Sequence, residues 1–442
     1  MARSTKHRWP ALSAAVSTRA DGRTMLTSLS PSEAEHSAAL SLLSSAAVRE
    51  RSAEMLEVAL RGDLAEFTVD LDRLPAIADA VVGTIRANYP SLKIPFHARW
   101  RHFVFQGRDL WAELQQRATF TDKTARARSR FDLAIVSVLL DAGAGATWRY
   151  RDQATGLTIG RSEGLALASL RMFEQGLFSN DLSDPLRADA DRLATLELDE
   201  LADAFQIGES NTMTGLDGRH RLLQQLGTSA LANSASFAGA DSARPGGLFD
   251  AIIRQADQNR IAAPDILREL LLALGPIWPG RHQLAGISLG DCWKHATIRR
   301  DDSTDGLIPF HKLSQWMAYS LVEPLEQAGF TVTDADGLTG LAEYRNGGLF
   351  IDLGAIVPRD PAILNAQHAA DSAIVVAWRA LTVALLDQLA PLVRERLGVS
   401  AEQFPLACLL EGGTWATGRA VAASRRADGG PQLAIQADGT VF

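Results

Sequence analysis

Residues 373–393 read AIVVAWRALTVALLDQLAPLV and form the most apolar long run in the chain. A span of about 20 apolar residues can cross a membrane, but this run contains Arg379 and Asp387, and charged side chains are costly inside a bilayer. We therefore expect a helix buried in the core of a soluble protein, with no membrane as partner.

Apolar residues recur at three- and four-residue spacing through most of the rest of the sequence, which is typical of helices with one buried face. Alternation typical of short strands is limited to residues 348–354 and 431–442. The sequence therefore predicts a mainly α, multi-helical protein with a few short strands. The expected helices are residues 32–60, 74–89, 131–143, 160–178, 199–205, 219–226, 248–273, 308–328 and 361–397.

The length of 442 residues exceeds the usual limit of about 250 to 300 residues for a single hydrophobic core. Residues 1–29 begin with a basic, Ser- and Ala-rich stretch that lacks the apolar centre of a secretory signal, so we expect a flexible N-terminal tail. We expect residues 30–442 to form one large domain. If that domain has two lobes, the Ser-, Ala- and Gly-rich segment 228–247 is where they would meet.

Composition excludes several classes of protein. Hydrophobic residues make up 46% and charged residues 22%, which is ordinary globular usage. The formal net charge of -8 repels a phosphate backbone, so we expect no nucleic-acid partner. Cys292 and Cys408 are too few for a disulfide framework, which favours a reducing compartment, and we expect the cytoplasm.

Common cofactor and nucleotide motifs are absent from the sequence. It contains no GxxxxGK[ST] loop, no GxGxxG after a strand, no HExxH and no CxxC. Asp291 and His295, four residues apart, would share one face of a helix, and His97 and His102 lie near each other in sequence; both pairs are weak indications of a metal site. We expect neither a metal nor an organic cofactor.

Four segments combine tryptophan with basic side chains: PFHARWRHF (95–103), WPGRHQLAGISLGDCWKH (278–295), LIPFHKLSQW (307–316) and LEGGTWATGR (410–419). An aromatic ring beside a cation suits a ligand that has a planar group and a negative charge. The alternative for each segment is a tryptophan packed in the core, with its basic neighbours extending to solvent. Four such segments in one chain favour a small anionic ligand.

The segment GLTGLAEYRNGGLF (337–350) places Glu343 between an apolar stretch and a double glycine. Burial would raise the pKa of this carboxyl toward the working range of a catalytic acid or base. Arg345 supplies a charge partner. The alternative is that Glu343 only caps a helix, and capping or ion pairing is also the ordinary role for Asp291 and Glu411.

The sequence resembles a known family over residues 30–442. The matching stretches are FHARWRHF, RFDLAIVSVLLDAGAGATWRY, GRSEGLALASL, WPGRHQLAGISLGDCWKH, LIPFHKLSQWMAYSLVEPLEQAG, EYRNGGLFIDLG, EGGTWATGR and the terminal DGTVF. They look like the uracil-catabolism family of fungi and bacteria known as Urc-four or Urg-three. The resemblance implies a place in the pathway that opens the uracil ring after conversion to the nucleotide and must later release urea from a ribosylurea-type intermediate.

A second, shorter similarity concerns GLTGLAEYR followed by LFIDLGAI, which is similar to the LTxxADYR segment of queuosine salvage proteins. Those are helical N-ribosyl hydrolases resembling DNA glycosylases, so the similarity implies a glycosylase-like fold. It places Glu343 at the position of their catalytic aspartate, with Tyr344 and Arg345 matching the residues that follow. Glutamate is one methylene longer, and Asn346 and Gly347 replace a Pro-Gln pair.

These resemblances imply an enzyme that hydrolyses the N-ribosidic bond of ribosylurea or its 5-phosphate, with a ribosyl or phosphoribosyl compound as small-molecule partner. Glu343 would stabilise the oxocarbenium-like transition state, and Asp291, His295 or Glu411 would assist the urea leaving group. Candidates for binding a 5-phosphate are Arg99, Lys294, His311, Lys312 and Arg419, and candidates for walls that exclude water are Trp293, Trp316 and Trp415.

Two other interpretations remain open at this stage. The first is a ureido or amide hydrolase of the same pathway that uses Asp291 and His295, with or without a metal. The second is a protein without catalytic activity that binds a ligand or a pathway partner, in which Glu343 only caps a helix.

Overall fold

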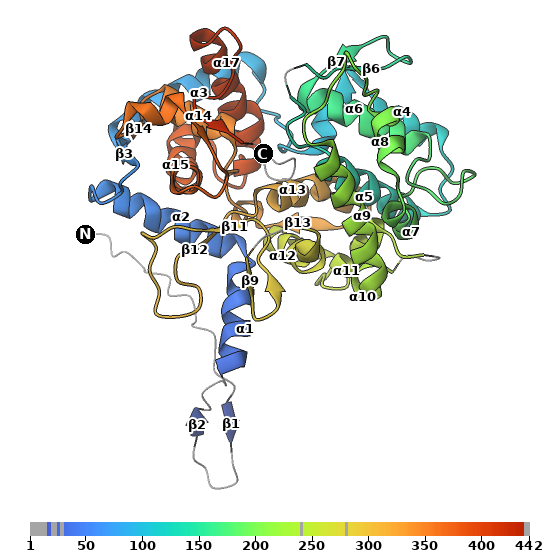
Figure 1. The fold of residues 1–442 in the computed structure, drawn as a ribbon, viewed down its shortest axis with the longest axis horizontal. Helices are drawn as coiled ribbons and strands as arrows, with labels where there is room; N and C mark the ends of the chain where they lie inside the picture. Colours follow the sequence, from blue (N-terminus) through green and yellow to red (C-terminus); the bar gives the residue numbers. More distant parts are fainter. Residues whose placement is uncertain are drawn as a thin grey trace.

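The computed structural model describes residues 16–18, 24–26, 31–145, 147–238, 242–278 and 282–436. It is mainly α-helical, as the hydrophobic spacing predicts (Figure 1). The helices are α1 (Pro31–Leu42), α2 (Ser45–Leu60), α3 (Leu74–Asn88), α4 (Leu110–Arg117), α5 (Lys123–Leu139), α6 (Arg161–Glu174), α7 (Ala190–Ala194), α8 (Leu198–Ala204), α9 (Leu216–Ala232), α10 (Ser234–Phe237), α11 (Leu248–Ile253), α12 (Ala263–Leu274), α13 (Lys312–Gln327), α14 (Tyr344–Asp352), α15 (Ala373–Leu397), α16 (Leu406–Leu409) and α17 (Trp415–Arg425).

The strands are short, and each described strand pairs with a single partner. Two pairs are parallel: β8 (Arg260–Ala262) with β13 (Thr331–Thr333), and β15 (Gln367–His368) with β16 (Ala434–Ile435). The antiparallel pairs are β1 (Val16–Thr18) with β2 (Thr24–Leu26), β3 (Phe67–Val69) with β14 (Ile356–Pro358), β4 (Val104–Phe105) with β5 (Arg108–Asp109), β6 (Tyr150–Arg151) with β7 (Thr158–Ile159), β9 (Gln283–Leu284) with β10 (Ile287–Ser288), and β11 (Cys292–Lys294) with β12 (Leu307–Pro309).

Helix α15 contains the apolar run that decides the fold. Its length and composition would allow a membrane span, but 78% of its most apolar window is buried inside the protein. Both charged residues of the run 373–393 have partners: Arg379 binds Asp291, and Asp387 binds Arg49 at 2.8 Å. The helix begins after the N-cap Ser372 and ends at Gly398, whose φ of 71° suits glycine.

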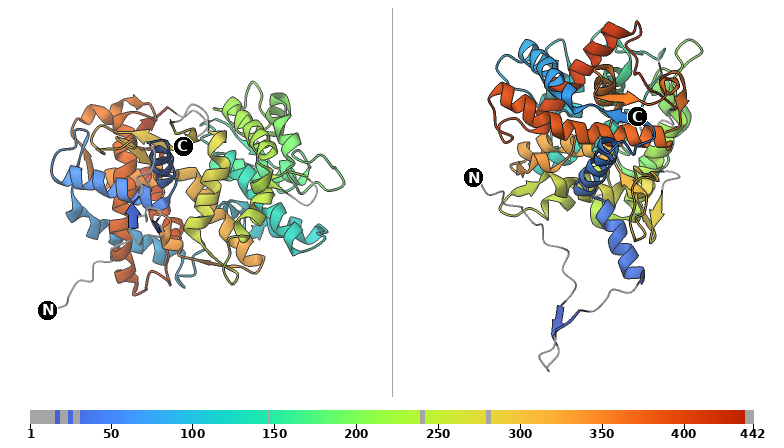
Figure 2. Two further views of the ribbon diagram at one scale, coloured as in Figure 1. Left: turned by 90° about the horizontal axis from the view of Figure 1, so that it is seen from below. Right: turned by 90° about the vertical axis from the view of Figure 1, so that its left-hand side faces the viewer.

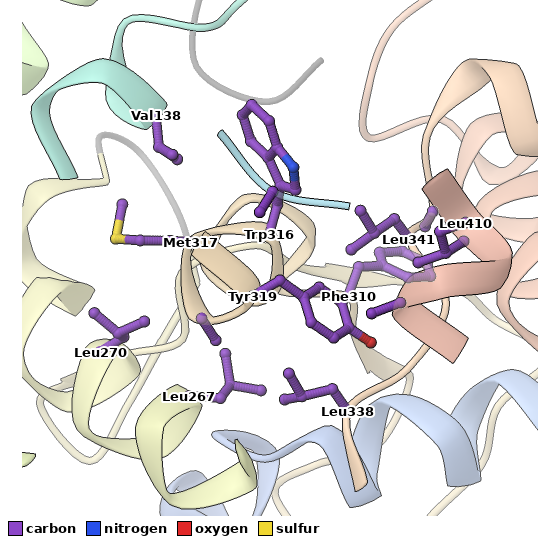
Figure 3. Packing of buried hydrophobic residues seen from close by; sticks show 14 of the residues in the cluster. Val138, Leu267, Leu270, Phe310, Trp316, Met317, Tyr319, Leu338, Leu341 and Leu410 are labelled. Atoms are coloured by element: carbon purple, nitrogen blue, oxygen red, sulfur yellow. The ribbon is translucent and has the colours of Figure 1, made fainter. Parts of the chain in front are cut away.

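Helices from the two ends of the sequence pack together. Helix α15 contacts α2 and α3, and α14 contacts α17, so blue and orange-to-red elements gather in one half of the molecule (Figures 1 and 2). The green and yellow elements α5 to α12 form the other half. Helix α13 packs against α5 and α12, and Figure 3 shows Trp316 and Tyr319 projecting from different sides of it.

Several predicted elements differ from the structure. Residues 348–352 were expected in a strand but lie within α14, because a buried strand and a buried helix both give a short apolar run. Asp291 and His295 do not share a helix face, because the segment between them is strand β11. The helix expected at 308–328 begins only at Lys312, after β12.

The domain predictions stay predictions. The described part of segment 228–247 contains the end of α9, α10 and a 3-10 turn at Pro245–Gly247. The predicted tail, residues 1–29, lies outside the described residues except for the pair β1 and β2. The last residues of the expected strand, 437–442, also lie outside them.

Candidate active site

A cavity of about 450 Å³ lies between elements from both halves of the molecule. This volume falls in the range of small-molecule sites, about 300 to 1,000 Å³. Its walls come from the 3-10 turn Arg99–Phe103, the loop after α5, the first turn of α6, α13, the start of α14 and Trp415. Residues 430–435, before the end of the described chain, complete it.

Glu343 lines this cavity and is also the N-cap of α14. Its two carboxylate oxygens accept backbone N–H bonds from Arg345 at 2.7 Å and from Asn346 at 2.6 Å. Burial raises the pKa of Glu343, while those two N–H groups and the charge of Lys312 partly oppose the rise. The carboxylate that caps α14 is therefore also a cavity-lining group, and the cap hydrogen bonds fix its orientation at the cavity wall. Capping the helix and acting in catalysis are compatible roles for it.

Close packing explains why one residue of the double glycine Gly347–Gly348 is a glycine. A Cβ on Gly347 would lie 2.6 Å from the indole of Trp378 on α15, so only glycine allows α14 to approach that helix so closely. Gly348 has open space around its Cα. The close approach at Gly347 places the N-terminus of α14, and with it Glu343, at the cavity.

Lys312 lines the same cavity, and no described residue forms a hydrogen bond or an ion pair with its ammonium group. Burial lowers the pKa of Lys312, and attraction to Glu343 and Asp141 opposes this lowering. The preceding residue, His311, adopts a left-handed conformation with φ of 49°, which is uncommon for a bulky side chain. The structure thus places a lysine amino group, without a hydrogen-bond or ion-pair partner among the described residues, in the same cavity as two carboxyl groups.

His97 is buried between two indole rings at the cavity, with ring centroids 6.1 Å from Trp316 and 6.0 Å from Trp415. Its Nδ1 lies 2.6 Å from a carboxylate oxygen of Glu411. Burial would raise the pKa of Glu411, but the hydrogen bond from His97 holds it below its usual range. The carboxylate is therefore the acceptor, and the imidazole is fixed with Nδ1 as donor.

Glu411 occupies a short π-helix, residues Leu410–Thr414, between α16 and α17. The glycines beside it are packed closely, since a Cβ on Gly412 would lie 2.5 Å from Ile94. Inserted π turns are frequent at functional sites because they redirect a side chain without ending the helix. Here the turn directs Glu411 toward His97 and is followed by Trp415 at the cavity wall.

Asp141 also lines the cavity, from the loop after α5. It accepts an N–H bond from Arg99 at 2.8 Å and a hydroxyl bond from Ser162 at 3.2 Å. Arg99 is fully buried and does not line the cavity itself. His102, which does, has its pKa lowered to about 3 by burial and by Arg99, so its imidazole is neutral at physiological pH.

Some sequence-predicted residues share the cavity and others do not. The cavity is lined by Glu343, Tyr344, Arg345, Lys312, Trp316 and Trp415. Two more do not line the cavity but form hydrogen bonds with residues that do: Glu411 with His97, and Arg99 with Asp141. Outside the lining are Asp291, Trp293, Lys294, His295, His311 and Arg419.

The residues outside the cavity have other partners. Asp291 forms an ion pair with Arg379, and Trp293 donates to Asp291 at 2.6 Å. His295 lies 3.6 Å from Glu66, so Asp291 and His295 do not form a joint site. The remaining predicted residues also lie outside the lining. Lys294 is exposed, and His311 contacts the carbonyl of Leu42. Arg419 pairs with Glu163 on the surface, and its guanidinium carbon lies 5.3 Å from the ring centroid of the lining residue Trp415.

Five polar residues of the lining were not among the catalytic or ligand-binding candidates chosen from the sequence, namely His97, His102, Asp141, Arg161 and Ser162. The two histidines lie in the segment PFHARWRHF, which the combination of tryptophan with basic side chains had indicated, but Arg99 was the candidate chosen from it for phosphate binding. Ser162 is the central residue of GRSEG (160–164), and this GxSxG pattern is a signal that could have found it. Asp141 had no signal, because an aspartate after a helix is an ordinary residue there. Among the described residues, no group of three or more His, Cys, Asp or Glu side chains is placed to hold a metal ion.

Comparison with known proteins identifies relatives along nearly the whole chain. Protein urg3 of Schizosaccharomyces pombe is 37% identical over 409 residues, which cover 91% of this chain and 98% of the relative. Uracil catabolism protein 4 of Lachancea kluyveri is 36% identical over 409 residues, which cover 85% of this chain and 92% of the relative. The family model described as a protein of unknown function, DUF1688, matches residues 41–442. The chain therefore belongs to the DUF1688 family.

Proposed function

We propose that this protein is an enzyme of uracil catabolism that hydrolyses the N-ribosidic bond of ribosylurea or of its 5-phosphate, releasing urea and ribose or ribose phosphate. The names of its relatives support the pathway. The observation that carries the proposed reaction is the cavity itself, in which a buried carboxyl, Glu343, stands beside an unpaired lysine and aromatic walls.

Glu343 would act at the anomeric carbon. Cleavage of an N-ribosidic bond passes through an oxocarbenium-like state, which a nearby carboxylate stabilises electrostatically. A carboxyl whose pKa is raised by burial is also suited to accept a proton from the attacking water. Because both of its oxygens are held by backbone N–H groups, the carboxylate needs no reorganisation during the reaction.

The urea nitrogen leaves poorly unless it is protonated or hydrogen-bonded, so the reaction needs a donor on that side. The pair of His97 and Glu411 meets this need better than Asp291 or His295, since His97 lines the cavity and the Glu411 carboxylate would stabilise its imidazolium form. In this scheme His97 acts as the imidazolium, whose Nδ1–H donates to Glu411 and whose Nε2–H gives its proton to the leaving nitrogen.

A phosphate on the ribose would find cations at the cavity in Arg161, Lys312 and Arg345. Arg345 is held by the carbonyl of Gly429 at 2.7 Å and by the ring of Tyr344, whose centroid is 4.8 Å from the guanidinium carbon. The rings of Trp316 and Trp415 would exclude water from the anomeric carbon.

The direct test is to incubate the purified protein with synthetic ribosylurea, with and without a 5-phosphate, and to assay released urea and ribose. Urea release with equimolar ribose species is the expected result. Ammonia or carbamate in place of urea would indicate a ureido or amide hydrolase. Loss of activity on chelator treatment, restored by a metal, would contradict the proposed mechanism. Binding without turnover would favour a protein that only holds a ligand.

A further inference from the structure

We propose that Asp141 binds the ribose hydroxyls, so that the cavity selects ribosyl over deoxyribosyl compounds. This inference rests on the proposed function for its choice of sugar. It adds what that proposal leaves open, namely which residue recognises the sugar and which class of sugar is rejected.

The first observation is that Asp141 is held rigidly at the cavity wall. Its side chain keeps only 10% of its surface exposed. The guanidinium that binds it belongs to Arg99, whose Nε donates to Ser137 Oγ at 2.6 Å and whose backbone N–H donates to Ser320 Oγ at 2.9 Å. Groups from α5, α6, the turn at Arg99–Phe103 and α13 thus fix one carboxylate.

The second observation is that Asp141 retains acceptor capacity toward the cavity. An ionised carboxylate has about four lone-pair positions. Arg99 occupies one position on Oδ1, and Ser162 occupies one on Oδ2. Positions therefore remain for hydroxyl donors, and a carboxylate on the ribose hydroxyls is a known mode of ribose recognition.

The third observation concerns the neighbouring groups of the lining. The imidazole of His102 is neutral, and the indole N–H of Trp316 is buried without a hydrogen-bond partner among the described residues. A fixed anion beside neutral polar groups would repel a phosphate and suits uncharged hydroxyls, which both donate and accept.

The position of Asp141 relative to Glu343 is consistent with one sugar reaching both. Asp141, Glu343 and Lys312 line the same cavity of about 450 Å³, and the charges of both carboxylates act on the pKa of Lys312. A ribofuranose is small enough for its anomeric carbon to face one carboxylate while its vicinal hydroxyls face the other.

The test measures binding of methyl β-ribofuranoside and of its 2-deoxy and 3-deoxy counterparts by ligand-observed NMR, so it needs no turnover. A hydrogen bond to a charged group corresponds to roughly 10- to 100-fold in affinity, and we expect each deoxy compound to bind the wild-type protein weaker by about that factor. Equal binding of all three compounds, or no binding of any, would overturn the proposal.

Asp141→Asn is the matching variant, and we expect its ratio of ribosyl to deoxyribosyl affinity to approach one. Asp152→Asn is the control, because Asp152 forms a similarly buried ion pair with Arg171 at 2.9 Å outside this cavity. It should keep the wild-type ratio. An unchanged affinity ratio in Asp141→Asn would overturn the proposal. If that variant does not fold, the relative affinities of the three sugars for the wild-type protein still test the proposal.

The two proposals fail differently. If the protein distinguishes the sugars but releases no urea from ribosylurea, the proposed reaction is contradicted and the proposed ribose subsite still stands. Release of urea together with equal binding of ribosyl and deoxyribosyl compounds would remove the subsite and leave the reaction.

Discussion

Asp291 and Arg379 form a buried bidentate ion pair, with oxygen–nitrogen distances of 2.8 and 2.7 Å. The same carboxylate accepts the backbone N–H of Lys312 at 3.0 Å. The residue that sequence reasoning placed in the catalytic machinery therefore lies behind the cavity, where it joins α15 to the start of α13. Its hydrogen bond holds the backbone of Lys312, a residue that lines the cavity.

Replacing Asp291 with asparagine should destabilise the protein strongly. The change removes the carboxylate charge that faces the buried guanidinium of Arg379, and breaking a buried pair in this way costs about 3 to 5 kcal/mol. Denaturant unfolding measures the effect. Asp79→Asn is the control, because Asp79 pairs with Arg396 on the surface with 69% of its side chain exposed, and its loss should cost about 1 kcal/mol or less.

Glu343→Gln should abolish turnover and keep the fold. The amide oxygen can still cap α14 but cannot act as a base or stabilise positive charge, so we expect urea release to fall by about 100-fold or more. Circular dichroism and sugar binding should stay close to wild type. Glu343→Ala is the informative companion, because it also loses the cap and should unfold about 1 kcal/mol more easily. Normal turnover in Glu343→Gln would remove this residue from the active site.

The raised pKa of Glu343 predicts the pH dependence of activity. As a base, the carboxyl must be ionised, so kcat/KM should rise with pH through a pKa above the usual value of about 4.3. The wild-type profile should therefore show an acidic limb displaced toward neutral pH. A flat profile in that region, in the presence of turnover, would contradict the assignment.

The same shift predicts an opposite trend in stability. The folded state binds this proton more tightly than the unfolded state, so the wild type loses stability as pH rises from the unfolded pKa to the folded pKa. Glu343→Gln has no such proton. Its free energy of unfolding relative to wild type should therefore increase across that window, and urea titrations at a series of pH values measure the difference.

Glu411→Gln tests the proposed donor to the leaving group. Without the carboxylate, the imidazolium form of His97 is no longer stabilised, and we expect a loss of about 10²- to 10⁴-fold with ribosylurea. A ribosyl substrate whose leaving group needs no protonation, such as a nitrophenolate, should lose much less. Equal losses on both substrates would indicate a role in structure alone.

His295→Gln separates the proposed reaction from the alternative hydrolase. His295 lies by Glu66, outside the cavity, so turnover should stay within a few-fold of wild type. A loss as large as that of Glu343→Gln would favour the alternative.

The sequence by itself determined the mainly helical fold, because three- and four-residue apolar spacing is a local property that survives in any packing. It also singled out Glu343, since an ionisable group between apolar residues and glycines is informative without coordinates. The helix over 348–352 was missed, because a short apolar run does not distinguish a buried helix from a buried strand.

Only the tertiary structure decided which polar residues meet. Residues 97, 141, 162, 312, 343 and 415 come from segments far apart in the chain, and no local pattern records their proximity. Packing also gave Asp291 and His295 separate partners, although they are close in sequence. Hydrophobic periodicity fixes which face of a helix is buried, whereas the partners of a buried charge depend on how distant helices pack, and that is decided only when the chain is folded.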